Sequence, residues 1–116
     1  MSEFIQIQWC CGSLNEARKV CRFLIQERYA ACANIIPWVE SIFMWDNKLE
    51  TAQETKVLIK TRMENYDVIR EVITSNTSYE LPEITFTKID GGSEEYMSWL
   101  EQSAFDHSHK PAPSLN

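Results

Sequence analysis

The segment from residue 29 to residue 60 constrains the fold most, because it predicts two long β-strands joined by one tight turn. Its first half is dominated by apolar residues, and its second half ends on the apolar, largely β-branched run at 57–59. Between the halves lies Asp46-Asn47-Lys48, a combination typical of a turn. Ordinary strands run to about 5–6 residues, so this hairpin projects from a small domain as an arm. An arm of this kind needs a partner to cover it, and we therefore expect self-association.

The composition limits the classes of function. The chain has 116 residues, which suits one domain, and a net charge of −6. Proteins that bind the phosphate backbone of nucleic acids cluster Lys and Arg, so this charge argues against that class. No segment approaches the ~20 apolar residues of a membrane span, and the first residues lack the regions of a secretory signal. We expect a cytoplasmic protein that binds neither nucleic acid nor membrane, with its four cysteines as free thiols.

Alternation of polar and apolar residues predicts a first strand over residues 4–10. Ile5, Ile7 and Trp9 occupy its core face, because successive side chains of a strand point to opposite sides. Pro37 interrupts the long hairpin. Since proline has no N–H to donate, we expect a bulge or bend near this residue.

Two capping boxes predict where helices begin. Ser13-Leu14-Asn15-Glu16 places Glu three residues after Ser, and a helix is expected from about residue 14 to 29. Thr61-Arg62-Met63-Glu64 has the same pattern and predicts a second helix that extends to about Ser75.

The last third of the chain predicts one more strand and one more helix. The dipeptide Leu81-Pro82 favours extended backbone, and alternation follows over residues 83–89. Acidic residues after Gly91-Gly92 suit the first turn of a helix that runs from residue 93 to about 105. The remaining segment, 106–116, is polar and contains proline, so we expect a disordered tail.

The resulting order is β-α-β-β-α-β with an extra C-terminal helix. This is the order of the α+β ferredoxin-like fold, here with a long hairpin arm between its second and third strands. We predict one such domain over residues 1–105. Right-handed crossovers place the first two helices on one face of an antiparallel sheet, and self-association is the natural way to cover the other face.

Five motifs in this order resemble the CutA family of divalent-cation tolerance proteins. The resemblance covers residues 4 to about 103 without a large gap. The motifs are A-A-C-x-N-x-I-P at 30–37, S-I-x-x-W-x-x-K-L-E at 41–50, E-x-x-x-x-I-K-T at 54–61, Y-E-x-P-E at 79–83 and Y-x-x-W-L at 96–100. It implies a homotrimer with the architecture of the PII signalling proteins, whose arms pair between subunits, and a role in tolerance of copper or another divalent cation.

The same resemblance implies a metal site built from a Cys near the end of the first strand, a His in an H-P-Y motif and a following Glu. Here the candidates are Cys10 or Cys11 with Glu83, while H-P-Y is replaced by Thr77-Ser78-Tyr79. Cu(II) favours imidazole ligands, so the loss of that His weakens the expectation of copper binding. The adjacent thiols point to opposite faces of a strand and cannot chelate together. For each thiol, the alternative is a small buried core residue.

A second set of candidates lies at the ends of elements, where ligand sites concentrate. Trp45, Glu54, Lys60, Tyr79 and Glu83 match family positions in the clefts between subunits. Lys60 could hold a small anion or pair with Glu83. The alternative is a set of hydrogen bonds and ion pairs that only locks the trimer. The first reading favours a signalling or scaffold protein that binds an anion or a partner protein in its cleft.

The two histidines, His107 and His109, lie in the predicted tail, where they either bind a metal or are simply solvated. The sequence contains no phosphate-binding loop, nucleophile elbow or zinc-protease motif. We therefore predict a protein that is not an enzyme.

Overall fold

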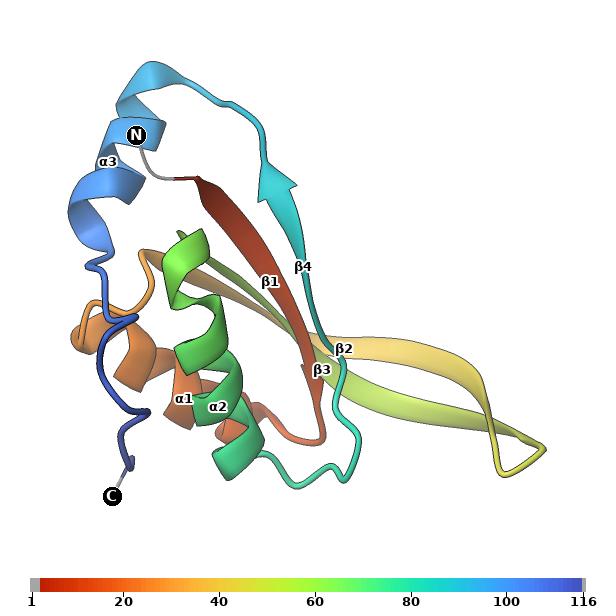
Figure 1. Ribbon diagram of the computed structural model, residues 1–116. Coiled ribbons are helices and arrows are strands. Elements are labelled where there is room, and N and C mark those ends of the chain that lie inside the picture. Colours follow the sequence, from red (N-terminus) through yellow and green to blue (C-terminus); the bar gives the residue numbers. More distant parts are fainter. Residues whose placement is uncertain (1–2, 116) are drawn as a thin grey trace.

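The computed structural model describes residues 3–115 and has the predicted α+β order. The four strands form one antiparallel sheet in the order β2-β3-β1-β4 (Figure 1). The elements are β1 (Phe4–Cys11), α1 (Leu14–Gln26), β2 (Cys32–Trp45), β3 (Lys48–Arg62), η1 (Met63–Asn65), α2 (Tyr66–Asn76), β4 (Ile84–Ile89) and α3 (Glu94–Ser103). Within the described residues, no helix is long and apolar enough to cross a membrane.

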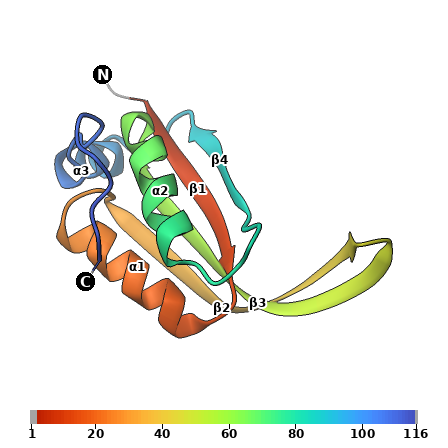
Figure 2. The same cartoon turned by 60° about the horizontal axis from the view of Figure 1, so that its bottom comes forward.

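The helices α1 and α2 cover one face of the sheet and enclose the core (Figure 2). Ile5, Ile7 and Trp9 of β1 are fully buried there, as the alternation predicted. Their β3 neighbours Val57 and Ile59 are equally buried. The other face of the sheet carries the alternate residues, among them Gln6, Gln8, Lys56 and Lys60, and α1 and α2 do not lie over it (Figure 1). At one end of this face α3 packs against the sheet, where Phe4 clusters with Leu100 and Ala104.

The hairpin arm is formed by the ends of β2 and β3 that extend beyond the body (Figure 1). Asp46 and Asn47 make its two-residue turn with positive φ angles of 50° and 64°, the geometry that suits a tight hairpin and that Asn and Asp tolerate. The register of the two strands shifts between Ile36 and Val39. This irregularity surrounds Pro37 and is the expected bulge.

The first capping prediction is confirmed in its main feature. The Ser13 hydroxyl accepts a hydrogen bond from the Glu16 backbone N–H at 3.1 Å. The helix ends at Gln26, three residues before the expected end, because Arg28 adopts the left-handed conformation with φ 63°.

The second capping prediction is wrong. β3 continues through Thr61 to Arg62, and the buried Thr61 hydroxyl donates to the Tyr29 carbonyl at 2.6 Å instead of capping a helix. A 3₁₀ turn follows, and α2 begins at Tyr66.

The segment after α3 returns along the helical layer (Figure 2). Buried Asn65 holds it, because the Asn65 side chain donates to the Tyr29 and Phe105 carbonyls at 2.9 and 2.7 Å and accepts from the His107 N–H at 2.8 Å. The His107 ring stacks on Tyr29 with centroids 3.8 Å apart. Farther on, Leu115 packs against the core. The polar composition of residues 106–116 predicts a disordered tail, but these contacts place part of that segment on the body.

Candidate functional site

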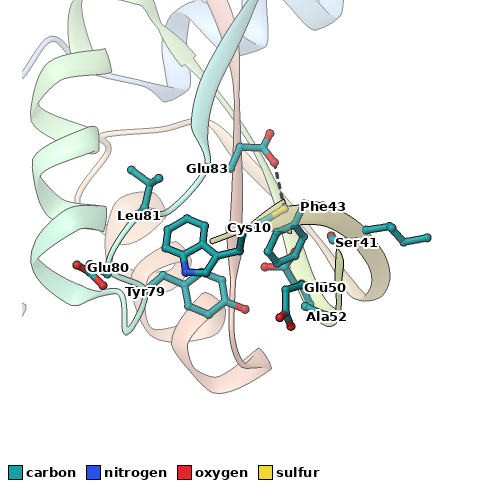
Figure 3. Close-up of a pocket in the computed structure, with 12 residues that line it drawn as sticks. Cys10, Ser41, Phe43, Glu50, Ala52, Tyr79, Glu80, Leu81 and Glu83 are labelled. Carbon is teal, nitrogen blue, oxygen red and sulfur yellow. Dashed lines mark hydrogen bonds between the residues drawn. The ribbon is translucent and has the colours of Figure 1, made fainter. Parts of the chain in front are cut away.

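A cavity of about 720 Å³ lies where the arm leaves the body (Figure 3). One wall is the arm, which contributes Phe43, Trp45, Glu50 and Glu54. The opposite wall is the loop between α2 and β4, with Tyr79 and Glu83, and Cys10 lies at the end of β1. These seven residues belong to its lining.

The pleat of the arm determines which of its side chains reach the cavity. Phe43 pairs directly with Glu50 across the two strands, and Ser41 pairs with Ala52. Paired residues point to the same face and alternate with the residues beside them. The cavity face therefore carries aromatic and acidic side chains, whereas the opposite face carries Ile42, Met44 and Leu49.

The loop wall is positioned by Glu16 of α1. Its carboxylate accepts hydrogen bonds from the Thr77 hydroxyl at 3.1 Å and from the Ser78 hydroxyl and N–H at 2.9 and 3.3 Å. Gly12 completes the support, since a Cβ atom there would lie only 3.2 Å from the Tyr79 ring. The sequence pattern predicts Glu16 as part of a capping box, but its side chain instead fixes the loop that carries Tyr79.

Cys10 and Glu83 meet inside the cavity, as the dashed line in Figure 3 indicates. The Cys10 thiol donates to a Glu83 carboxylate oxygen at 3.3 Å, and Lys56 lies 3.8 Å from the other oxygen. Burial, followed by the hydrogen bond to Glu83, raises the pKa of Cys10 from 9.0 to about 12. The thiol is consequently protonated at neutral pH, and a metal ion must displace that proton to bind the sulfur.

Cys11 is part of the core and not of the cavity. It is fully buried on the helical face, and its thiol lies 3.5 Å from the Ser13 carbonyl. Burial raises the pKa of Cys11 to about 11. The structure thus places Cys10 and Cys11 on opposite sides of β1, as strand alternation requires.

Four of the five predicted cleft residues line this one cavity: Trp45, Glu54, Tyr79 and Glu83. Burial and a hydrogen bond to Glu54 raise the pKa of Tyr79 to about 12, so its phenol remains neutral over the physiological range.

Lys60, the fifth predicted residue, is not in the cavity lining. It pairs in register with Gln6 and Cys32, and its ammonium group donates to the Asn34 side chain at 2.9 Å. The predicted ion pair between Lys60 and Glu83 is not formed, and Lys56 is the lysine that lies beside Glu83. The two lysines share a face of β3 but are four residues, roughly 13 Å, apart along the strand.

The donor atoms of the cavity suit a soft metal only in part. Among residues 3–115, no group of three or more His, Cys, Asp or Glu side chains is placed to hold a metal ion. Cys10 and Glu83 supply one sulfur and one carboxylate, without the imidazole that Cu(II) favours. The thiolate of Cys10 suits Cu(I), with a Glu83 carboxylate oxygen as the second donor. His107 is held on Tyr29 and contributes nothing to this set.

Fold and site together define a class: a ferredoxin-like domain with an extended hairpin arm and a cleft at the base of that arm. Comparison with known proteins identifies the family. The family model described as CutA1 divalent ion tolerance protein matches residues 5–103, and the chain belongs to this family.

Individual relatives agree with this assignment. The divalent-cation tolerance protein CutA of Archaeoglobus fulgidus is 34% identical over 103 residues, which cover 89% of this chain and 98% of that protein. The chloroplastic CutA of Arabidopsis thaliana is 36% identical over 86 residues, 74% of this chain. The chain spans about half the length of the plant relatives, 47% for Arabidopsis thaliana and 45% for Oryza sativa. The crystal structure of CutA1 from Oryza sativa has a TM-score of 0.86 and 30% identity over 90% of this chain and 96% of that one.

Proposed function

We propose that this chain forms a non-catalytic homotrimer that binds cations in the cleft at the base of its arm and takes copper weakly, as Cu(I). The observation that carries this proposal is the contact between the Cys10 thiol and the Glu83 carboxylate in a cavity lined mainly by acidic and aromatic groups. Its name links the family to divalent ions. We place the protein in the cytosol, which suits four cysteines that are all free.

The trimer is supported by the apolar surface that a single chain leaves open. Ile42, Met44 and Leu49 on the outer face of the arm are 66%, 62% and 71% exposed. Patches of this kind on soluble proteins mark interaction sites. In addition, β2 and β4 are the edge strands of the sheet, and pairing between subunits would remove those edges.

Weak Cu(I) binding follows from the chemistry of Cys10. A soft thiolate is a good ligand for Cu(I), but the hydrogen bond to Glu83 and the burial of the thiol favour its protonated form. Binding replaces the Cys10 proton by the metal, and Glu83 changes from hydrogen-bond acceptor to metal ligand. Affinity therefore increases with pH, about tenfold for each unit below the pKa of the thiol.

An anaerobic competition titration with Cu(I) tests the proposal. We expect one ion per subunit in the unmodified trimer, loss of this binding in Cys10→Ser, and retention in Cys11→Ser. Cys11→Ser is the matched control, because it removes the neighbouring thiol from the opposite face of the same strand. Equal affinity in all three proteins would refute the metal part of the proposal.

A signalling or scaffold trimer that binds a partner protein or an anion is the second candidate. Trp38 near the bulge is 57% exposed and adds to the apolar surface of the arm, which favours a protein partner. For an anion, the candidate is Lys60 with Asn34, outside the acidic cavity. A screen of anionic metabolites by thermal shift, with Lys60→Ala as the variant, tests this alternative: no shift in the unmodified protein removes the anion from consideration.

A further inference from the structure

We propose that the arm side of the cavity binds an organic ammonium cation, which the aromatic side chains Phe43, Trp45 and Tyr79 surround and Glu50 neutralises. This inference rests on the proposed function, because it names a class of cation for the same cleft. It differs in the ligand and in the residues that hold it, since Cys10 is not one of them.

The carboxylates of the cavity are not equivalent. Glu83 is engaged by the Cys10 thiol, the Thr85 hydroxyl and Lys56. Glu54 accepts a hydrogen bond from the Tyr79 phenol. The Glu50 carboxylate, in contrast, has neither a hydrogen bond nor an ion pair with any described residue. The uncompensated negative charge of the cavity therefore lies at Glu50, on the arm.

Aromatic side chains converge around this charge. Phe43 is the direct cross-strand neighbour of Glu50, and Trp45 lies two residues farther along on the same face of the arm. Tyr79 extends from the loop toward Phe43 and Glu50 (Figure 3). The faces of aromatic rings attract cations within about 6 Å. Because the Tyr79 phenol stays neutral, its ring contributes to this attraction without adding a charge.

The combination of rings and a carboxylate selects the chemical class of the ligand. An anion is repelled by the acidic lining. A small hydrated metal ion gains little from apolar ring faces and needs several oxygen or sulfur donors around one point. An organic ammonium ion is large and weakly hydrated, so it gains from the rings through its alkyl groups and from the carboxylate through its charge. The volume of about 720 Å³ also suits an organic molecule, for which sites of roughly 300–1,000 Å³ are usual.

The two faces of the arm have different roles, one in subunit contacts and the other in ligand binding. The outer face carries the exposed apolar side chains Ile42, Met44 and Leu49, beside the polar Thr51 that pairs with Ile42, and is assigned to contacts between subunits. The inner face, with Phe43 and Glu50, combines rings and acid and is directed at the cavity of its own chain. Subunit assembly through the outer face leaves the inner face available to a ligand.

Calorimetric titration of the intact trimer with tetramethylammonium chloride tests the inference, with sodium chloride as the blank. We expect binding that weakens as salt is added. Glu50→Gln and Phe43→Leu should each reduce the affinity about tenfold. Glu40→Gln is the matched control, since Glu40 pairs with Gln53 on the opposite face of the arm, and its affinity should be unchanged. Should either arm variant fail to assemble, Tyr79→Leu on the loop provides the same test.

Absence of tetramethylammonium binding, or an equal loss in Glu40→Gln and Glu50→Gln, overturns the inference. The sedimentation and Cu(I) titration of the same samples separate this failure from that of the proposed function. A trimer that binds Cu(I) but not tetramethylammonium refutes only the organic cation. A protein that is monomeric and binds neither refutes both.

Discussion

The outer face of the arm gives the most demanding prediction: Leu49→Glu should dissociate the trimer. Leu49 is 71% exposed in the single chain and pairs across the strands with Met44. In our account, neighbouring subunits cover this pair and Ile42. The substitution would therefore place a carboxylate in an apolar contact in three copies at once.

The magnitude follows from the exposed fractions. Full burial of a large apolar side chain contributes about 1.5–3 kcal/mol, and Ile42, Met44 and Leu49 each have about two thirds of their surface left to bury. Each therefore contributes about 1–2 kcal/mol on assembly, or about 9–18 kcal/mol for the nine residues of a trimer. Leu49→Glu removes the burial free energy of Leu49 in each of the three subunits and adds a desolvation cost of several kcal/mol for each carboxylate. The total loss, on the order of 10 kcal/mol or more, is comparable with the whole apolar contribution of the arms.

Sedimentation velocity of the unmodified protein and of Leu49→Glu measures this effect directly. We expect a trimer for the former and a monomer or a rapidly exchanging mixture for the latter. Phe105→Glu is the control, because Phe105 is an exposed apolar residue (54%) that follows α3 on the helical side, away from the arm. A Leu49→Glu protein that sediments as the same trimer would show that the interface lies elsewhere, and the assignment of the two arm faces would be refuted.

Two further predictions concern stability. Asn65→Ala removes three hydrogen bonds between buried Asn65 and the backbone at Tyr29, Phe105 and His107. At about 1 kcal/mol for each bond, the free energy of unfolding measured by urea denaturation should fall by about 3 kcal/mol. An unchanged urea midpoint would contradict the role of Asn65. Alkaline pH should destabilise the fold, because burial raises the pKa of Cys10 from 9.0 to about 12. Its stabilising effect is complete below pH 9 and is lost as the pH rises toward 12, since the unfolded chain loses this proton first; melting temperatures measured across this window should fall less in Cys10→Ser.

The sequence was sufficient for the strands and for their arrangement. Period-two alternation identified the buried face of β1, and the Asp46-Asn47 pair marked the turn, because both residues tolerate the positive φ that a tight hairpin requires. The beginning of the second helix was misplaced, since Thr-x-x-Glu is compatible with either a helix cap or the end of a strand. The Thr61 hydroxyl donates to the Tyr29 carbonyl, 32 residues away in the chain, and therefore does not cap a helix. Local sequence patterns contain no information about such a distant partner.

The site was predicted less completely, and the reason is strand register. Lys56 and Lys60 lie on the same face of β3, so alternation cannot tell which of them approaches Glu83. The pairing of Cys10 with Lys56 across β1 and β3 decides the question, and it depends on how the strands align in the folded sheet. The separation of Cys10 from Cys11 needed only the alternation of a strand and was anticipated.

Anomalous diffraction at the copper absorption edge, from crystals of the trimer loaded anaerobically with Cu(I), tests the central claim most directly. We predict one peak per subunit in the cavity at the base of the arm, beside the Cys10 sulfur and within bonding distance of Glu83. Two results would contradict the assignment of this cleft as the metal site. One is a peak confined to His107 or His109, and the other is copper bound at any other site with none beside Cys10.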